Sequence, residues 1–181
     1  MDLKNYRVTI KSGRFYLRVL EDSDASEKYA SWLNDPIVNK YLETKKTTIE
    51  KLKKYINEKL ESGTCLLFGI FLNENNEHIG NVKLELADFE EKHENLGIFI
   101  GERDYWGKGI ATEVISLITD HALNNLGVDR LCLGVLSGND AAIRVYEKCG
   151  YKIFKVYKNL VNYGDVLYDQ IIMCKWKSMP N

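Results

Sequence analysis

The fold of this chain is decided by the stretch Ile98-Phe99-Ile100-Gly101-Glu102-Arg103-Asp104-Tyr105-Trp106-Gly107-Lys108-Gly109-Ile110-Ala111-Thr112. An apolar, strand-like run leads through a short loop with glycines into a segment of helical periodicity. The first amides of a helix lack intrahelical acceptors and, together with the helix dipole, favour a phosphate group. Gly107 and Gly109 let a ligand approach the backbone closely, and Thr112 adds a hydroxyl donor. The stretch therefore predicts a strand–loop–helix unit that can bind a pyrophosphate.

Two common phosphate-binding patterns do not fit this loop. The Walker pattern GxxxxGK[ST] is absent, and no pair of carboxylates suggests a metal site for nucleotide hydrolysis. The dinucleotide pattern GxGxxG fails because Thr112 stands where the third glycine is needed. A GxG pair alone is also typical of a plain structural loop, so the loop pattern by itself leaves both interpretations open.

The residues before this stretch predict a strand, two helices and further strands. Asp22 or Ser23 is expected to cap the first helix, and Thr47 with Glu50 forms a capping-box pattern for the second. The expected strands of this half span 14–20, 66–72, 78–86 and 94–101.

After residue 108 the pattern changes to an alternation of helix and strand. Helices are expected over 109–126 and 141–148, and strands over 131–136, 151–158 and 166–176. The order strand–helix–helix–three strands–helix–strand–helix–two strands implies one mixed sheet flanked by helices, an α/β (α+β) fold.

Composition narrows the class of protein. The 181 residues are 45% hydrophobic and 28% charged, which is typical of one soluble domain. Because 25 basic residues face 26 acidic ones, we expect no nucleic-acid partner. The N-terminus lacks the apolar core of a signal peptide and no apolar run is long enough to span a bilayer, so we expect no membrane partner and a cytoplasmic location.

The four cysteines, Cys65, Cys132, Cys149 and Cys174, stand far apart without a CxxC pair. A metal site is therefore not expected, and the sequence favours reduced, buried thiols. His78 and His121 show no partner at a metal or catalytic spacing, so we expect them at the surface.

Three segments together resemble a known family. The loop from Trp106 to Glu113, the block Asn139-Asp140-Ala141-Ala142-Ile143-Arg144-Val145-Tyr146-Glu147-Lys148-Cys149-Gly150-Tyr151 and the early Trp32-Leu33-Asn34-Asp35-Pro36 resemble the GNAT N-acetyltransferases. They are most similar to the Rim-type branch, which contains ribosomal-protein N-terminal acetyltransferases. The resemblance covers residues 14–176. Asp104 and Ala142 depart from the family pattern, which often has Gln or Arg and Ser there, and this removes two side-chain contacts to the cofactor.

The resemblance implies one GNAT domain over residues 1–181, with a core of about 14–176. It implies a seven-stranded, mostly antiparallel mixed sheet whose central strands splay apart after a bulge to admit acetyl-CoA. The implied activity is acetyl transfer to a primary amine by direct attack, without an enzyme nucleophile or a metal. The implied cofactor-binding residues are Phe99, Ile100, Gly101, Trp106, Gly107, Lys108, Gly109, Ile110, Ala111, Thr112, Asn139, Ala142 and Tyr146.

The catalytic roles follow the same resemblance. Tyr146 is the expected proton donor to the CoA thiolate, because a phenol has a pKa of about 10, near that of a thiol; a packing role is the alternative. The Gly101 N–H is the expected polarising group for the thioester carbonyl. Glu85 is the first candidate for the general base; Glu94, His93 or a water chain are alternatives. For Asn139, helix capping alone competes with an additional bond to the pantetheine arm.

The residues that bind the acceptor amine are expected between the first two helices. Trp32, Asn34 and Tyr41 are the expected acceptor-binding residues, and helix packing is the alternative for Trp32. A basic run of Lys45, Lys46, Lys51, Lys53 and Lys54 suits an acidic acceptor, although such runs are often only solvated. A protein N-terminus, a small amine and a nucleotide-linked amino sugar stay open as acceptors, as do a monomer and a homodimer. The alternative to an enzyme is a non-catalytic acyl-CoA-binding sensor or regulatory module of the same fold.

Overall fold

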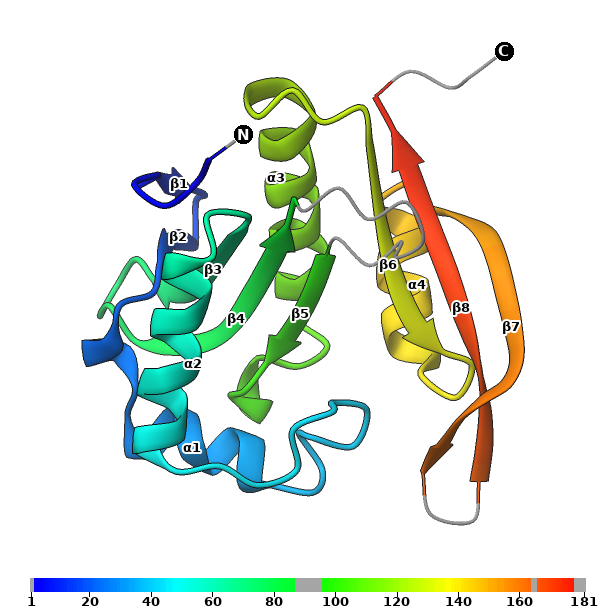
Figure 1. Cartoon of the computed structure of the whole chain (residues 1–181), viewed down its shortest axis with the longest axis horizontal. Coiled ribbons are helices and arrows are strands. Elements are labelled where there is room, and N and C mark those ends of the chain that lie inside the picture. The colour runs from blue at the N-terminus through cyan, green and yellow to red at the C-terminus, as the bar shows by residue number, and fades with distance from the viewer. Residues whose placement is uncertain (1, 87–95, 164–165, 178–181) are drawn as a thin grey trace. The chain divides into compact units, whose positions relative to one another are not determined.

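The computed structural model describes residues 2–86, 96–163 and 166–177. The chain divides into two compact units, the first made of Met1–Ala87 and Ile98–Lys108, the second of Asp88–Gly97 and Gly109–Asn181. The described residues form eight strands, four α-helices and two short 3-10 helices (Figure 1). The ladders between described strands are mostly antiparallel, which confirms the expected α+β class. These strands form a five-stranded and a three-stranded sheet, and not the single sheet that was expected.

The first unit is built on a five-stranded sheet in the order β1-β2-β3-β4-β5. The strands are β1 (Thr9–Lys11), β2 (Phe15–Val19), β3 (Cys65–Leu72), β4 (His78–Glu85) and β5 (Leu96–Ile100). The ladders β1·β2, β2·β3 and β3·β4 are antiparallel. The three-residue β1 was not expected from the sequence, because a strand this short carries almost no alternation signal, and it raises the expected count of seven strands to eight.

A β-bulge interrupts the ladder between β3 and β4. Ile70 pairs with Gly80 but Phe71 pairs with His78, so Ile79 is the extra residue. A bulge bends its strand and turns the backbone groups of the extra residue out of the ladder. The Ile79 carbonyl accepts hydrogen bonds from the amides of Gly101 and Glu102, at 2.8 and 3.1 Å. These bonds fix the backbone just after β5.

The helices between β2 and β3 are η1 (Asp22–Asp24), α1 (Glu27–Asn34) and α2 (Ile49–Glu61), with α2 lying against β3 (Figure 1). Both expected N-caps are wrong. Ser26 caps α1 and accepts from the Tyr29 amide, because Asp22 and its neighbours form a separate 3-10 turn. Thr48, not Thr47, caps α2 and accepts from the Lys51 amide. The amphipathic faces of α1 and α2 pack with β3 residues into one apolar core: Leu20, Ala25, Tyr29, Ala30, Trp32, Leu33, Leu52, Ile56, Leu67 and Phe71.

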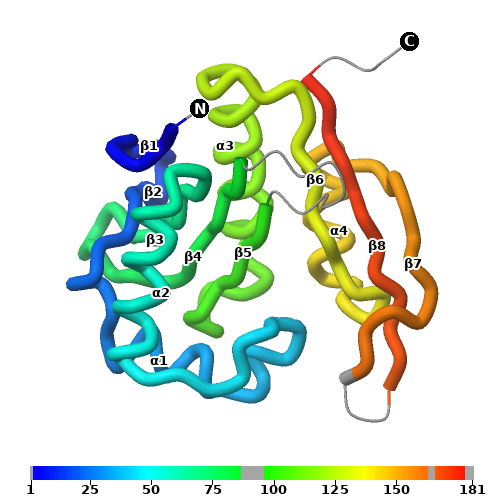
Figure 2. The backbone as a smooth tube through the Cα atoms, in the orientation of Figure 1, coloured from blue at the N-terminus to red at the C-terminus, as the bar shows by residue number. Residues whose placement is uncertain are grey.

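The second unit contains α3 (Ile110–Asn125), β6 (Arg130–Leu136), α4 (Asp140–Lys148), β7 (Lys152–Tyr163) and β8 (Val166–Trp176). β8 lies between β6 and β7 and is antiparallel to both, as Figure 2 shows along the yellow, red and orange parts of the chain. α3 contacts α4 and β6. The buried face of α3 is apolar, with Val114, Ile115 and Ile118 fully enclosed, as its helical periodicity predicts.

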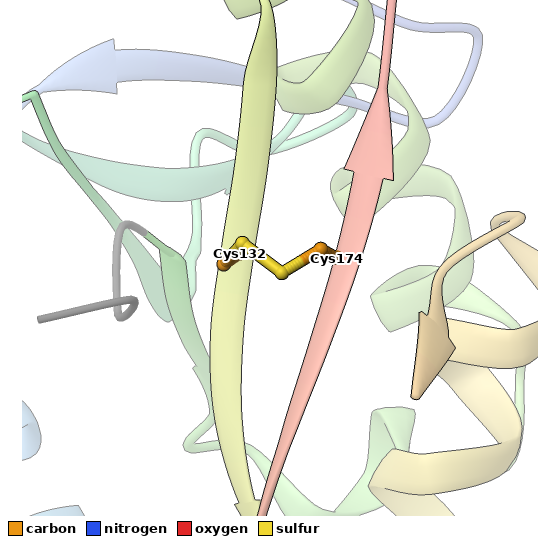
Figure 3. Close-up of a disulfide and its surroundings, with 2 residues drawn as sticks. All are labelled: Cys132 and Cys174. Atoms are coloured by element: carbon orange, nitrogen blue, oxygen red, sulfur yellow. A yellow bond between two sulfur atoms is a disulfide. The ribbon is translucent and has the colours of Figure 1, made fainter. Parts of the chain in front are cut away.

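A disulfide joins Cys132 on β6 to Cys174 on β8 (Figure 3). The two residues face each other directly in the antiparallel ladder. The expectation of four reduced thiols is therefore wrong for this pair, whereas Cys65 and Cys149 are free and buried. No local pattern indicates the bond, because the two positions are 42 residues apart and meet only once the strand register is set.

None of the helices described is long and apolar enough to cross a membrane.

Candidate active site and cofactor loop

The end of β5 is fixed by backbone and aromatic contacts. The Gly101 N–H donates to the Ile79 carbonyl at 2.8 Å, so this hydrogen is already used. The expected polarisation of a thioester by the Gly101 amide is therefore wrong for this structure. The Trp32 indole lies directly on Gly101, where a Cβ would overlap the ring. Only glycine fits this position, and the reason is the packing of an aromatic ring and not a ligand.

Polar contacts continue from this point into the loop. The Trp32 indole Nε1 donates to Glu102 at 3.0 Å, and the Lys28 ammonium lies 3.1 Å from the same carboxylate oxygen. Further along, the short helix η2 (Arg103–Tyr105) precedes Trp106, whose indole Nε1 donates to the Ile100 carbonyl at 2.8 Å. Arg14 donates to the Lys108 carbonyl at 3.0 Å. The loop between β5 and Gly109 is thus held at several points within the first unit.

The start of α3 has the features that an anion site needs. Gly109 is the N-cap with φ of +79°, and Gly107 has φ of +72°, both in the left-handed region that favours glycine. The Glu113 amide is bonded to the Gly109 carbonyl, so the amides of Ile110, Ala111 and Thr112 come before the first intrahelical bond. No side chain caps the helix, and a Cβ on Gly107 would meet no atom within 4 Å. The residues present therefore fit a pyrophosphate, which backbone amides and the dipole of a 16-residue helix would hold.

The second motif lies on α4. Asn139 caps this helix: its side chain accepts from the Ala142 amide at 3.2 Å, which confirms capping. The bond from Asn139 to pantetheine stays a prediction, and Ala142 contributes no polar side-chain atom.

Tyr146 is on the buried face of α4 and only 6% of it is exposed. Its ring centroid lies 6.2 Å from that of Tyr151. Burial, with a smaller contribution from the nearby Cys149, raises the pKa of Tyr146 to about 12. The hydroxyl makes no hydrogen bond to any part of the chain that the structure describes, so it keeps both its donor and its acceptor capacity. A protonated phenol without a protein partner is a suitable proton donor.

Contacts that the sequence did not suggest hold Tyr146 relative to α3. The Cys149 thiol donates to the Thr112 carbonyl and accepts from the Ser116 hydroxyl, at 3.3 and 3.5 Å. The Tyr151 hydroxyl is 2.8 Å from the buried Thr119 hydroxyl. These pairs join residues more than 30 positions apart in the chain, so no local pattern could have indicated them.

Glu85 lies at the end of β4 with 13% of its side chain exposed. One carboxylate oxygen is 3.3 Å from the Lys59 ammonium, and the other accepts from the Thr64 hydroxyl at 3.1 Å. The alternative bases His93 and Glu94 lie outside the described residues.

The three expected acceptor residues have different surroundings. Trp32 is 4% exposed and belongs to the aromatic core described above. Both ends of the Asn34 amide bond the backbone of Thr47, at 2.8 and 3.1 Å, which closes the loop between α1 and α2. Tyr41 is half-buried beside the Lys40 ammonium. The geometry favours the packing alternative for Trp32 and gives Asn34 a structural bond.

The lysines of the basic run have two kinds of surroundings. Lys45 donates to the carbonyls of Asn39 and Lys40, at 2.7 and 3.0 Å, so it braces its own loop. Lys46, Lys51, Lys53 and Lys54 are exposed.

His78 was expected at the surface, and the structure shows it half-buried. Its ring stacks on Phe71 with centroids 4.8 Å apart and meets the edge of Trp32 at 5.0 Å. Its Nε2 lies 2.8 Å from Asn81 Oδ1. Burial lowers the pKa of His78, although the bond to Asn81 and the charge of Asp24 oppose the shift. His121 is half-buried.

Among the residues that the structure describes, no three His, Cys, Asp or Glu side chains gather as metal ligands would.

Comparison with known proteins agrees with the loop and the α4 motif. A family model described as an acetyltransferase (GNAT) domain matches residues 14–152. A relative in Bacillus licheniformis, named uncharacterized N-acetyltransferase p20, is 28% identical over 148 residues, which cover 80% of this chain and 82% of the relative.

Solved structures share the fold. The spermidine N-acetyltransferase from Vibrio cholerae, in complex with CoA and spermine, has a TM-score of 0.81 at 20% identity and covers 92% of this chain and 97% of its own. The ribosomal L7/L12 alpha-N-protein acetyltransferase RimL, in complex with coenzyme A, also has a TM-score of 0.81, at 15% identity, with 93% and 98% covered.

Proposed function

The chain belongs to the GNAT acetyltransferases, and on this premise we propose that it transfers the acetyl group of acetyl-CoA to a primary amine with Tyr146 as proton donor. The family membership itself establishes a GNAT N-acetyltransferase that uses acetyl-CoA. The observation that carries the proposal is the strand–loop–helix unit from Ile98 to Thr112, in which two left-handed glycines lead into the uncapped start of α3.

The loop and the first turn of α3 are proposed to bind the cosubstrate. The amides of Ile110, Ala111 and Thr112 would hold its pyrophosphate, and Gly107 leaves the space for it. Phe99 and Ile100 in β5 and Asn139 at the start of α4 would bond the pantetheine arm, Asn139 through its Nδ2, since Oδ1 already caps the helix. When bound, acetyl-CoA supplies an activated acyl group as a thioester. No nucleophile of the chain is required, because the acceptor amine attacks directly.

The role of Tyr146 follows from its surroundings. Its raised pKa keeps the phenol protonated at neutral pH, and its hydroxyl has no partner in the described chain that would withhold the proton. The Cys149 and Tyr151 contacts fix this side chain relative to the first turns of α3.

The amine must lose a proton to become a nucleophile. Among the candidates, Glu85 lies within the described residues, and we propose it as the general base. Lys59 and Thr64 would orient its carboxylate. Replacement by Gln should lower kcat, and an unchanged kcat would exclude Glu85 as the base.

The acceptor class is a primary amine on a protein N-terminus, a small molecule or a nucleotide-linked amino sugar. Tyr41, which is half-buried, is proposed to line the acceptor side, and Trp32 and Asn34 are proposed to support it from the apolar core and the loop between α1 and α2. A single domain over residues 1–181, a cytoplasmic location and a monomer or homodimer complete the proposal.

The test is release of CoA thiol from acetyl-CoA with a panel of peptides, small amines and amino sugars. We expect thiol release that depends on one acceptor class, together with addition of one acetyl group to that acceptor by mass spectrometry. Binding of acetyl-CoA without thiol release for any acceptor would favour the sensor alternative.

A further inference from the structure

Lys28 on α1 connects two carboxylates that come from different parts of the first unit. Its ammonium lies 2.6 Å from Glu77, in the turn before β4, and 3.1 Å from Glu102, the first loop residue after Gly101. The same ammonium lies 5.6 Å from the centre of the Trp32 ring. Lys28 therefore contacts a carboxylate and an aromatic ring that both meet the end of β5.

Both carboxylates lie in or beside the cofactor loop, residues 101–108. Glu102 is itself a loop residue and also accepts from the Trp32 indole at 3.0 Å. Glu77 lies near Tyr105, three residues further along the loop: after burial, the charge of Glu77 is the largest contribution that raises the pKa of this phenol. Lys28 thus holds the loop directly at residue 102, and its second partner, Glu77, lies beside residue 105.

The arrangement is electrostatically consistent only with a charged Lys28. Burial alone would lower its pKa, but the bonds to Glu77 and Glu102 outweigh this and raise it. Without the ammonium, the two carboxylates would lose their shared counter-charge and repel each other. The loop would then lose its ion pair at Glu102 and keep the bonds from Trp32 and Arg14 and the backbone bonds to Ile79.

We propose that Lys28 is a positioning residue for acetyl-CoA binding, which holds residues 102–105 so that the chain enters Gly107 and Gly109 in the conformation that the cofactor needs. The proposal rests on the proposed function, since the loop is assigned to acetyl-CoA. In this role Lys28 acts through Glu102 and Glu77.

The first test measures CoA binding by titration calorimetry in the Lys28→Met and Glu102→Gln variants. The ion pairs are partly exposed and screened by water, so each contributes only a modest free energy. We therefore expect Kd to rise by no more than about fivefold. At saturating acetyl-CoA, kcat should stay within about twofold of wild type, because Tyr146 is untouched. Lys28→Arg keeps the charge and should restore most of the affinity.

Asp24→Asn is the matched control. It breaks the half-buried pair between Arg18 and Asp24, which belongs to the same unit but has no bond to loop residues 101–108 among the described contacts. If Lys28→Met weakened CoA binding only by destabilising the protein, Asp24→Asn would weaken it equally. An equal rise of Kd in the two variants would therefore overturn the proposal.

The second readout does not need CoA. Trypsin should cut after Arg103 and Lys108 faster in Lys28→Met than in wild type or Asp24→Asn, as followed by mass spectrometry. Unchanged cleavage and unchanged Kd in Lys28→Met would overturn the positioning role only. Wild-type protein that binds no CoA would instead overturn the proposed function, and with it the assignment of this loop.

Discussion

The residues before Gly109 and those after it are held in different ways. In the first unit, charges and aromatic rings fix the loop: Lys28, Glu102, Trp32 and Arg14 all contribute. In the second unit, neutral groups fix α3 and α4, namely the Cys149 thiol and the hydroxyl pair of Thr119 and Tyr151, and a disulfide joins the sheet. The first unit should therefore respond to pH and salt, and the second to reductant.

The largest expected effect is in the second unit. Reduction of the disulfide between Cys132 and Cys174 removes a cross-link over 42 residues. By loop entropy this should lower the free energy of unfolding by about 4 kcal/mol. Urea unfolding with and without dithiothreitol measures the change.

The double variant Cys132→Ser with Cys174→Ser is the control, since dithiothreitol should not affect it. Thiol titration of the unfolded wild type without reductant should find only Cys65 and Cys149. Detection of all four thiols under these conditions would show that the bond does not form.

Tyr146→Phe tests the chemistry that the second unit contributes. Loss of a general acid should lower kcat about 100-fold while the Kd of acetyl-CoA stays unchanged. Since burial raises the pKa of Tyr146 to about 12, this residue should cause no loss of kcat between neutral pH and about pH 10.

The neighbouring Tyr151→Phe is the matched control. The change removes the bond to Thr119 and should cost about 1 kcal/mol of stability, but it keeps the ring beside Tyr146, so kcat should fall far less than in Tyr146→Phe. Equal kcat in wild type and Tyr146→Phe would reject the proton-donor role.

The smallest effect is expected in the first unit, at His78. Its pKa is lowered by burial, so the folded state prefers the neutral ring and the unfolded state binds the proton more tightly. Stability should fall as the pH drops through the unfolded pKa of about 6.5 towards the lower folded value. His78→Gln should flatten this fall, as measured by thermal unfolding between about pH 5 and 8.

His121 is also half-buried with a lowered pKa, so His121→Gln is a suitable comparison. The ring of His78 lies among Phe71, Trp32 and the Asp24 charge, and its variant should have the larger effect. An acid-induced loss that is the same in His78→Gln and wild type would contradict this.

The helices, most strands and the cofactor loop could be predicted from the sequence because their signals are local. The periodicity of α3 and the Gly107–Gly109 pair lie within one short stretch. The family assignment, confirmed by the match over residues 14–152, used the same local motifs.

The errors arose where distant segments meet. His78 is partly covered by rings from α1 and β3, and Cys174 meets Cys132 only through the strand register. The Gly101 amide is taken by the bulge at Ile79, which alternation cannot indicate. No local pattern singles out Lys28, because its two carboxylates are 49 and 74 positions away in the chain.

The most direct test of the account is titration of acetyl-CoA into wild-type protein and Gly109→Ala. An alanine at φ of +79° costs about 1–2 kcal/mol, so the start of α3 should shift and Kd should rise about tenfold. Circular dichroism should show the fold of the variant intact. Wild-type protein that does not bind acetyl-CoA, or equal Kd values for the two proteins, would contradict the assignment of Gly107–Thr112 as the pyrophosphate site.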